Sequence, residues 1–355
     1  MKACVLFEPG PAENLKIVEV RDPDPPRESD LLVRVEACGI DGHDVVTRSG
    51  LLGRGLHPSE LLVRENGSWE KRFGTILGHE IAGTVVAVGP GVRETAVGDR
   101  ITCNVRSTCR YCDLCRMGRS NSCRQARGVE GGYAELAIVP EGAALKIPDT
   151  VSSAEACIVS CAIGTPYRGI TRAGQPRFTD RILVCGAGGG LGIHALQLLA
   201  QSGGFVMAVT TSPHKAPLLE RYGAHAVICV NEGRFDRQVM ELTDGHGADL
   251  ILDTVGGTSF NGGGFRSLAQ FGRYVFVGQI NDEFARFAVP HLFWKEAQLT
   301  GTSTPDYLDM KQAMELVAAR KVSPVVSEAF PLEETPRMHR LLEQKQVAGR
   351  AVITF

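Results

Sequence analysis

Strand-like and helix-like segments alternate along the chain from about Cys161 onward, and this alternation constrains the fold more than any other feature of the sequence. Connections of this β-α-β kind produce a parallel sheet with helices on both faces, an arrangement that commonly binds a dinucleotide. We therefore expect an α/β domain over residues 161–304. Its expected elements are strands at 181–185, 205–210, 226–229, 249–253 and 273–277, and helices at 192–201 and 215–222.

The first part of the chain has a different pattern, in which glycine and proline separate short β-like runs. This pattern predicts a compact, mostly antiparallel β domain whose loops are long enough to carry functional residues. Near the end of the chain, a helical stretch at 307–320 leads to a closing strand at 351–355, which we expect to return to this domain. The first domain then comprises residues 1–160 and 305–355, with strands at 2–7, 31–37, 81–88, 100–103 and 133–139.

Four cysteines lie close together in a polar, arginine-rich stretch as C-x2-C-x2-C-x7-C: Cys109, Cys112, Cys115 and Cys123. Thiolates with this spacing can converge on one tetrahedral zinc, and four protein ligands leave no position for a substrate. We therefore predict a structural zinc that stabilises a lobe at about 103–127. The alternative is a disulfide cluster, which fits poorly with the other cysteines of the chain, several of them in apolar runs.

Composition argues against several classes of partner. The 355 residues are 43% hydrophobic and 22% charged with a formal net charge of −2, so nucleic acid is not expected. The densest basic stretch, 106–127, coincides with the cysteine cluster and is better explained as a solvated lobe than as a surface that binds nucleic-acid phosphates. Residues 182–200 are apolar but interrupted by glycines, so we expect no membrane span. The amino terminus reads as a strand rather than a targeting peptide, which favours a cytoplasmic protein.

A glycine-rich loop follows the strand expected at 181–185 and opens the next helix, with Gly186, Gly188, Gly189 and Gly192 as its key positions. Between a strand and a helix, such a loop lets backbone amides approach a pyrophosphate at the positive end of the helix dipole. The alternative is a merely flexible turn. We predict a dinucleotide site here.

The end of the following strand bears on which dinucleotide would bind. Where a carboxylate would hold the hydroxyls of an adenosine ribose, the chain has Thr210 and Ser212, followed by Lys215. Hydroxyls and a cation suit a ribose 2′-phosphate, so NADP(H) is favoured over NAD(H). The alternative is an ordinary polar helix start with Ser212 as its N-cap.

Together these motifs resemble those of medium-chain dehydrogenases/reductases of the zinc-containing alcohol dehydrogenase type, over essentially the whole chain. Gly78-His79-Glu80 is similar to the family's GHE signature, and the cysteine cluster and glycine-rich loop to its zinc lobe and coenzyme loop. The resemblance implies a GroES-like, mostly-β catalytic domain and a Rossmann coenzyme domain with a doubly wound parallel sheet. Arg350 falls where relatives place an arginine on the coenzyme phosphate. Residues 161–170 and 192–197 are especially similar to archaeal acryloyl-CoA reductases.

The resemblance also implies a catalytic zinc held by one cysteine, the histidine of GHE and a second cysteine. His79 and Cys161 match the last two positions, whereas the family's C-G-x-C is replaced by C-G-I-D, which puts Asp41 at the first. Asp41 and Cys161 as anions with neutral His79 still neutralise zinc, although an oxygen donor should hold it less tightly. Glu80 would stand beside the metal as an alternative ligand or a supporting carboxylate.

His43 occupies the place of the serine or threonine that passes the alcohol proton in relatives. An imidazole can do this because its pKa lies near the operating pH; alternatively, His43 stacks on the nicotinamide or caps Asp44. By the same resemblance, Asp44 is a structural support. The long polar segment between Asp44 and Gly78, which includes His57, is expected to form a lid over the substrate, or else a solvated surface loop.

We therefore expect an NAD(P)-dependent enzyme: a zinc-containing oxidoreductase that prefers NADP(H) and transfers hydride between the nicotinamide and an alcohol/carbonyl substrate. One alternative is an NADPH-dependent 2-enoyl-CoA or enone reductase that needs no catalytic zinc. Another is a nonenzymatic NADPH-binding protein. The expected partner is a small-molecule substrate, and the resemblance implies either a homodimer with sheets paired edge to edge or a homotetramer of two such dimers.

Overall fold

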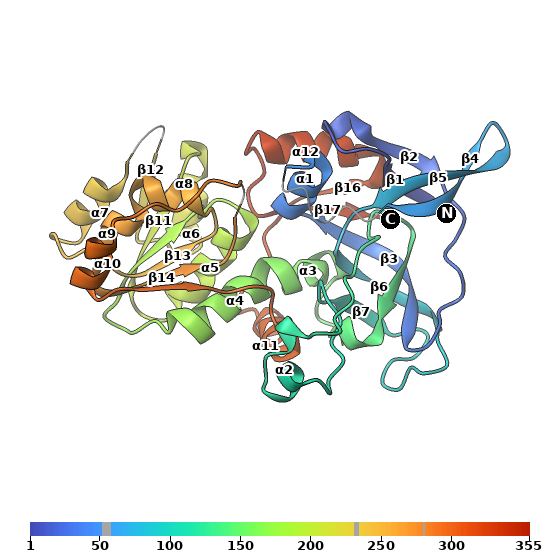
Figure 1. Ribbon diagram of the computed structural model, residues 1–355, viewed down its shortest axis with the longest axis horizontal. Coiled ribbons are helices and arrows are strands. Elements are labelled where there is room, and N and C mark those ends of the chain that lie inside the picture. Colours follow the sequence, from blue (N-terminus) through green and yellow to red (C-terminus); the bar gives the residue numbers. More distant parts are fainter. Residues whose placement is uncertain (52–57, 231–233, 280) are drawn as a thin grey trace. The chain divides into compact units, whose positions relative to one another are not determined.

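The computed structural model describes residues 1–51, 58–230, 234–279 and 281–355 (Figure 1). The chain divides into two compact units: unit 1 is Met1–Cys161 with Thr304–Phe355, and unit 2 is Ala162–Ser303. Each unit has an apolar core of its own. In the described parts of the chain, no helix is long and apolar enough to cross a membrane.

Unit 1 is built on a seven-stranded sheet in the order β16-β17-β3-β6-β7-β9, with β8 pairing β3. Its neighbouring strands are antiparallel except for the parallel pair β16 and β17. The last strand of the chain pairs with β3, so the carboxyl end returns to this unit. The strands are β3 (Asp30–Ile40), β6 (Glu80–Val88), β7 (Arg100–Cys103), β8 (Leu136–Pro140), β9 (Ala144–Lys146), β16 (Val326–Pro331) and β17 (Arg350–Thr354).

A second sheet of unit 1 corrects the expectation of a lid or loop between Asp44 and Gly78. It has the order β2-β1-β5-β4, with β1 (Lys2–Leu6), β2 (Leu15–Glu19), β4 (Ser59–Glu65) and β5 (Ser68–Ile76). β4 and β5 form an antiparallel hairpin around Asn66 and Gly67, both with positive φ. Several charged side chains on its strands form ion pairs, two within the hairpin and one with β2. His57, part of the same prediction, lies outside the described residues.

Unit 2 contains a six-stranded, wholly parallel sheet in the order β12-β11-β10-β13-β14-β15. The chain starts in the middle at β10, moves outward to β12, and then returns to the other side of β10 with β13. This is the doubly wound order, so the predicted fold class is confirmed. The strands are β10 (Arg181–Cys185), β11 (Phe205–Thr210), β12 (Ala226–Cys229), β13 (Ala248–Asp253), β14 (Leu268–Phe276) and β15 (Gln298–Gly301).

The α-helices are short. Those of unit 1 are α1 (Gly42–Ser49), α2 (Asp113–Arg116), α3 (Ser153–Cys157), α11 (Tyr307–Ala318) and α12 (Thr335–Glu343). Those of unit 2 are α4 (Thr165–Arg168), α5 (Gly190–Ala200), α6 (Ala216–Arg221), α7 (Asp236–Leu242), α8 (Gly257–Ser259), α9 (Phe265–Ser267) and α10 (Val289–Lys295).

One expected strand begins later than its apolar pattern suggested. β8 was expected at 133–139 but starts at Leu136. The reason is that the backbone of Tyr133 pairs elsewhere: its N–H donates to Leu77 O at 3.0 Å, and its carbonyl accepts from Cys4 N at 2.8 Å. The segment before β8 is therefore tied to the residues that immediately precede β6.

Candidate metal and coenzyme sites

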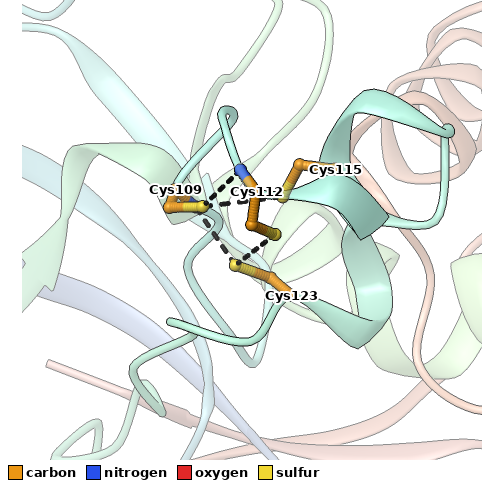
Figure 2. Close-up of side chains that lie close together, drawn as sticks. All are labelled: Cys109, Cys112, Cys115 and Cys123. Atoms are coloured by element: carbon orange, nitrogen blue, oxygen red, sulfur yellow. Dashed lines mark hydrogen bonds between the residues drawn. The ribbon is translucent and has the colours of Figure 1, made fainter.

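The four clustered cysteines converge in the lobe that contains α2. Figure 2 shows their side chains turned toward a common point, and the four Sγ atoms all lie within 4.8 Å of one another. The Sγ atoms of Cys109 and Cys115 are 3.9 Å apart, and those of Cys112 and Cys123 are 4.0 Å apart. These separations far exceed the S–S bond of about 2.05 Å. All eleven cysteines of the chain are free thiols.

The donor set fits zinc. Tetrahedral Zn–S bonds of about 2.3 Å require sulfur atoms about 3.8 Å apart, close to the separations in the lobe. Backbone amides also point at the sulfurs: Cys112 N lies 3.3 Å from Cys109 Sγ, and Cys109 N lies 3.3 Å from Cys123 Sγ. Hydrogen bonds from the backbone of Cys115 and Arg124 lower the pKa of Cys112 to about 6. Burial instead raises the pKa of Cys115 to about 12, so the backbone hydrogen bonds favour the thiolate form at Cys112 in particular.

A second cluster brings together three residues predicted from the sequence as metal ligands. Asp41 Oδ2 lies 3.5 Å from His79 Nε2 and 3.5 Å from Cys161 Sγ. One oxygen, one nitrogen and one sulfur at these spacings match the edges of a tetrahedron with bonds of roughly 2.0–2.3 Å, so the donor set fits zinc. Cys161 lies in the π-helix Val159–Gly164, an irregular turn of the kind that often marks functional positions.

The start of α1 explains why Asp41 presents only one oxygen to this cluster. Asp41 is the N-cap of α1, where its Oδ1 accepts from Asp44 N at 3.0 Å, while Asp44 Oδ2 accepts from Asp41 N at 3.1 Å. This reciprocal capping box fixes both carboxylates. The second oxygen of each remains directed at His79: Asp41 Oδ2 faces Nε2, and Asp44 Oδ1 lies 3.5 Å from Nδ1.

Charge dominates the environment of His79. Burial lowers its pKa, but the carboxylates of Asp41 and Asp44 outweigh burial and raise the pKa well above its usual value. Burial acts in the opposite sense on Asp41, yet His79 and Arg350 bring the pKa of Asp41 well below its usual value. The pocket therefore favours positive charge between these two carboxylates, whether on the imidazole or on a metal.

Glu80 and Arg350 form a buried ion pair beside this cluster. Arg350 Nε lies 3.1 Å from each carboxylate oxygen of Glu80, and its Nη2 lies 3.5 Å from Asp41 Oδ2 and 3.6 Å from Cys161 Sγ. Burial raises the pKa of Glu80 to about 7 despite the attraction of Arg350. Glu80 thus forms an ion pair with Arg350, the residue predicted from the sequence to bind a coenzyme phosphate. That coenzyme-binding role of Arg350 stays a prediction.

His43 lies on α1 at the edge of the cluster and is exposed, whereas Asp41, Asp44 and His79 are buried. Its ring stands edge-on to that of His79, with centroids 5.4 Å apart. Both rings line a small cavity together with Thr47 and Glu130, two residues that the sequence analysis did not single out. Neither carried a motif signal, because Thr47 is an ordinary helical residue and Glu130 lies in a loop.

Gly78 provides a test of how tightly the cluster is packed. Its φ is +94°, and a Cβ there would lie 2.5 Å from Tyr133 Cδ1 and 2.8 Å from Cys38 Sγ. Gly78→Ala should therefore lower the free energy of unfolding by about 2–4 kcal/mol, through backbone strain plus overpacking. Denaturant unfolding measures the effect. Gly67→Ala is the matched control: φ there is +85° with open space around it, so only the strain remains. Equal losses in both variants would contradict the packing argument.

In unit 2, the glycine-rich loop connects β10 to α5. Gly186 has φ +73°, and a Cβ on Gly192 would lie 2.3 Å from Gly186 O and 2.6 Å from Ala187 Cα. This close approach explains why α5 begins at Gly190, two residues earlier than expected: the loop and the first turn of the helix are packed backbone against backbone. Gly189 is the N-cap of α5, so the backbone N–H groups of the first turn of the helix point out of its N-terminus.

The predicted ribose-phosphate residues gather at this loop. Lys215 Nζ donates to Gly188 O at 3.3 Å, and a Cβ on Gly188 would lie 2.8 Å from Lys215 Cδ and 3.3 Å from Thr210 Oγ1. Ser212 N donates to Thr210 Oγ1 at 3.1 Å. Ser212 precedes the 3-10 turn Pro213–Lys215 without a side-chain capping bond. The Thr210 hydroxyl and the Lys215 side chain thus lie beside the loop, and the backbone N–H of Ser212 is bonded to that hydroxyl.

Comparisons with known proteins agree with this geometry. Residues 27–149 match a family model described as "Alcohol dehydrogenase GroES-like domain", and residues 190–319 match one described as "Zinc-binding dehydrogenase". The NAD-dependent alcohol dehydrogenase of Sulfurisphaera tokodaii is 30% identical over 99% of this chain and 99% of that protein. The acryloyl-coenzyme A reductase of the same organism is 28% identical over 99% of each. A crystal structure of AibC is 33% identical with a TM-score of 0.86, covering 100% of this chain and 95% of that one.

Proposed function

Because the chain belongs to the zinc-binding medium-chain dehydrogenase/reductase family, we propose that this oxidoreductase transfers hydride between a nicotinamide and an alcohol or carbonyl substrate. The observation that carries the proposal is the convergence of His79 Nε2 and Cys161 Sγ on Asp41 Oδ2, each at 3.5 Å. Zinc bound by these three residues would supply a Lewis acid for the substrate oxygen.

The residues around the cluster have separate tasks in this mechanism. Asp44 holds the Nδ1 side of His79 and so directs Nε2 toward Asp41. Glu80 and Arg350 offset each other's charge in a buried position. His43 takes up or releases the substrate proton at its imidazole and passes it to solvent, because its exposed ring lies beside His79.

A second candidate is NADPH-dependent reduction of a 2-enoyl-CoA or enone without catalytic zinc. It is favoured by Arg350, whose Nη2 lies within 3.6 Å of both Asp41 and Cys161, so that a protein cation already faces two of the three ligands. It is also favoured by the similarity to a protein named acryloyl-coenzyme A reductase. In this mechanism a polar group of the cleft stabilises the developing enolate.

Turnover before and after chelation distinguishes the two candidates. We expect the purified protein to oxidise small alcohols, to lose this activity when a mild chelator removes one labile zinc per chain, and to regain it with added zinc. NADPH-dependent reduction of acryloyl-CoA that chelation leaves unchanged would instead establish the second candidate. Zinc analysis of the same samples confirms that the four-cysteine site keeps its metal throughout.

We further propose that the coenzyme is NADP(H), bound at the loop of unit 2. Lys215, Thr210 and Ser212 support this, because an ammonium and two hydroxyls can bind a 2′-phosphate. The NAD-dependent name of one relative points the other way, so a direct test is needed.

Lys215→Ala should reduce kcat/KM with NADPH by about 10- to 100-fold, the worth of one charge-assisted hydrogen bond. The value with NADH should change by less than about threefold, because NADH lacks the phosphate. Steady-state kinetics with both coenzymes measure this. Arg221→Ala, which removes an exposed cation from α6, is the control and should affect neither. Equal losses with NADPH and NADH would contradict a 2′-phosphate contact.

Finally, we propose a cytoplasmic homodimer or a tetramer of two such dimers. The edge strand β15 and the exposed aromatic rings of Phe293 and Trp294 on α10 support pairing of two copies through unit 2. Free thiols throughout the chain support a reducing compartment. Light scattering after gel filtration measures the assembly, and a monomer at micromolar concentration would contradict it.

A further inference from the structure

Asp253 is a buried carboxylate in unit 2 that the mechanism above does not use. It is the last residue of β13 and is 0% exposed. Its Oδ1 accepts from Val255 N at 2.8 Å and from Gly256 N at 3.2 Å. Ser259 Oγ lies 2.7 Å from Oδ1 and 2.6 Å from Oδ2, and the Tyr274 hydroxyl donates to Oδ2 at 2.6 Å. These donors are all neutral, so hydrogen bonds must offset the cost of burying the charge.

The same hydrogen bonds hold the turn that follows β13, residues 254–256, which we call the β13 turn. This turn packs closely on the glycine-rich loop: a Cβ on Gly186 would lie 2.4 Å from Thr254 Oγ1 and 2.7 Å from Val255 Cγ2. On the side of β14, a Cβ on Gly278 would lie 2.9 Å from Thr254 O. The β13 turn is therefore wedged between two glycines, with no room for a side chain at either.

The position of this turn in the sheet gives it a functional meaning. The chain moves outward from β10 to β12 and then returns to the other side of β10 with β13, so the strand order reverses between β10 and β13. In open parallel sheets, ligands bind in the crevice at the carboxyl ends of the strands where this reversal occurs. Here Cys185 at the end of β10 pairs with Asp253, and Thr254 Oγ1 donates to Cys185 O at 2.9 Å. The glycine-rich loop and the β13 turn are thus the two sides of that crevice.

We propose that Asp253, Ser259 and Tyr274 are positioning residues that fix the β13 turn against the glycine-rich loop and so set the width of the coenzyme crevice. This inference rests on the proposed coenzyme site of unit 2. A site that has its binding arrangement for only part of the time binds more weakly by that fraction. The β13 turn packs on Gly186, whereas the residues proposed for the 2′-phosphate adjoin Gly188. Loosening the turn should therefore weaken NADPH and NADH alike.

The test measures the dissociation constants of NADPH and NADH on the full chain by calorimetric titration, together with thermal unfolding. Ser259→Ala and Tyr274→Phe each remove one hydroxyl from the carboxylate of Asp253. Each variant should raise both dissociation constants about 10-fold, the worth of one hydrogen bond to a buried charged group. The kcat at saturating coenzyme should change by less than about twofold, because the loss is one of coenzyme binding alone.

Ser267→Ala is the matched control. Ser267 is also a buried serine of unit 2, but its hydroxyl donates to Gly263 O at 2.9 Å. This variant should lower thermal stability about as much as Ser259→Ala while leaving both dissociation constants unchanged. Wild-type dissociation constants in Ser259→Ala and Tyr274→Phe, a rise confined to NADPH, or an equal rise in Ser267→Ala would overturn the inference and leave the proposed function intact. Failure of the wild-type chain to bind either coenzyme would overturn both.

Discussion

Replacing Cys112 with serine is expected to remove the metal from the four-cysteine lobe and to destabilise unit 1 by more than about 4 kcal/mol. The lobe depends on the metal because its own elements are very short: α2 has 4 residues and the adjoining 3-10 turn has 3, and neither contributes a buried residue to a core. Serine offers a poor ligand, and the three remaining cysteines cannot complete a tetrahedron.

Zinc analysis and thermal unfolding measure this together. One zinc per chain should be lost, and the unfolding midpoint should fall by about 8 °C or more. Cys229→Ser is the control, since Cys229 is a partly buried free thiol outside the lobe; it should keep both zinc content and midpoint. If Cys112→Ser retained the zinc content of wild type, the lobe would hold no structural metal.

Several strands were predictable to the residue: β10, β11, β12 and β7 have the expected bounds. For β10 and β11 the physical reason is burial, because all but the first residue of each is buried. Such strands are nearly continuous apolar runs, which are easy to delimit in a sequence. The same runs fixed the parallel sheet and, through the glycines after β10, the coenzyme loop.

The β4–β5 hairpin was missed because its exposed strands are rich in charged residues, a composition typical of a surface loop. A signal was nevertheless present, since Asn66-Gly67 is a strong two-residue hairpin turn. Cross-strand ion pairs such as Lys71 with Glu60 explain the charges without any lid.

The candidate site divides in a similar way. Motif spacing pointed to His79 and Cys161, and the pair of aspartates three residues apart could also have revealed the capping box of α1. The contact between the Tyr133 hydroxyl and His339 Nε2, two residues 206 positions apart in the sequence, could not be predicted. A single sequence contains no local pattern for a contact that depends on how distant segments pack.

Asp41→Asn should strongly weaken binding of the labile metal while leaving the fold intact. Asparagine is as good an N-cap as aspartate, so α1 keeps its capping bond to Asp44 N. The amide, however, removes the negative charge that faces His79 and Cys161 at 3.5 Å. We expect labile zinc affinity to fall at least about 100-fold and kcat/KM for alcohol oxidation about 10²- to 10³-fold, the loss of a Lewis acid worth several kcal/mol.

The chain supplies a matched control in a second capping box of the same kind. Asp306 caps α11 and exchanges the same two bonds with Asp309, and both residues are buried. Asp306→Asn should therefore match Asp41→Asn in thermal stability but keep its labile zinc and activity. If Asp41→Asn lost its zinc but reduced acryloyl-CoA as fast as wild type, the metal would be dispensable, and metal-free reduction would become the better account. Zinc content and turnover of the Asp41→Asn variant thus distinguish between the two proposed reactions.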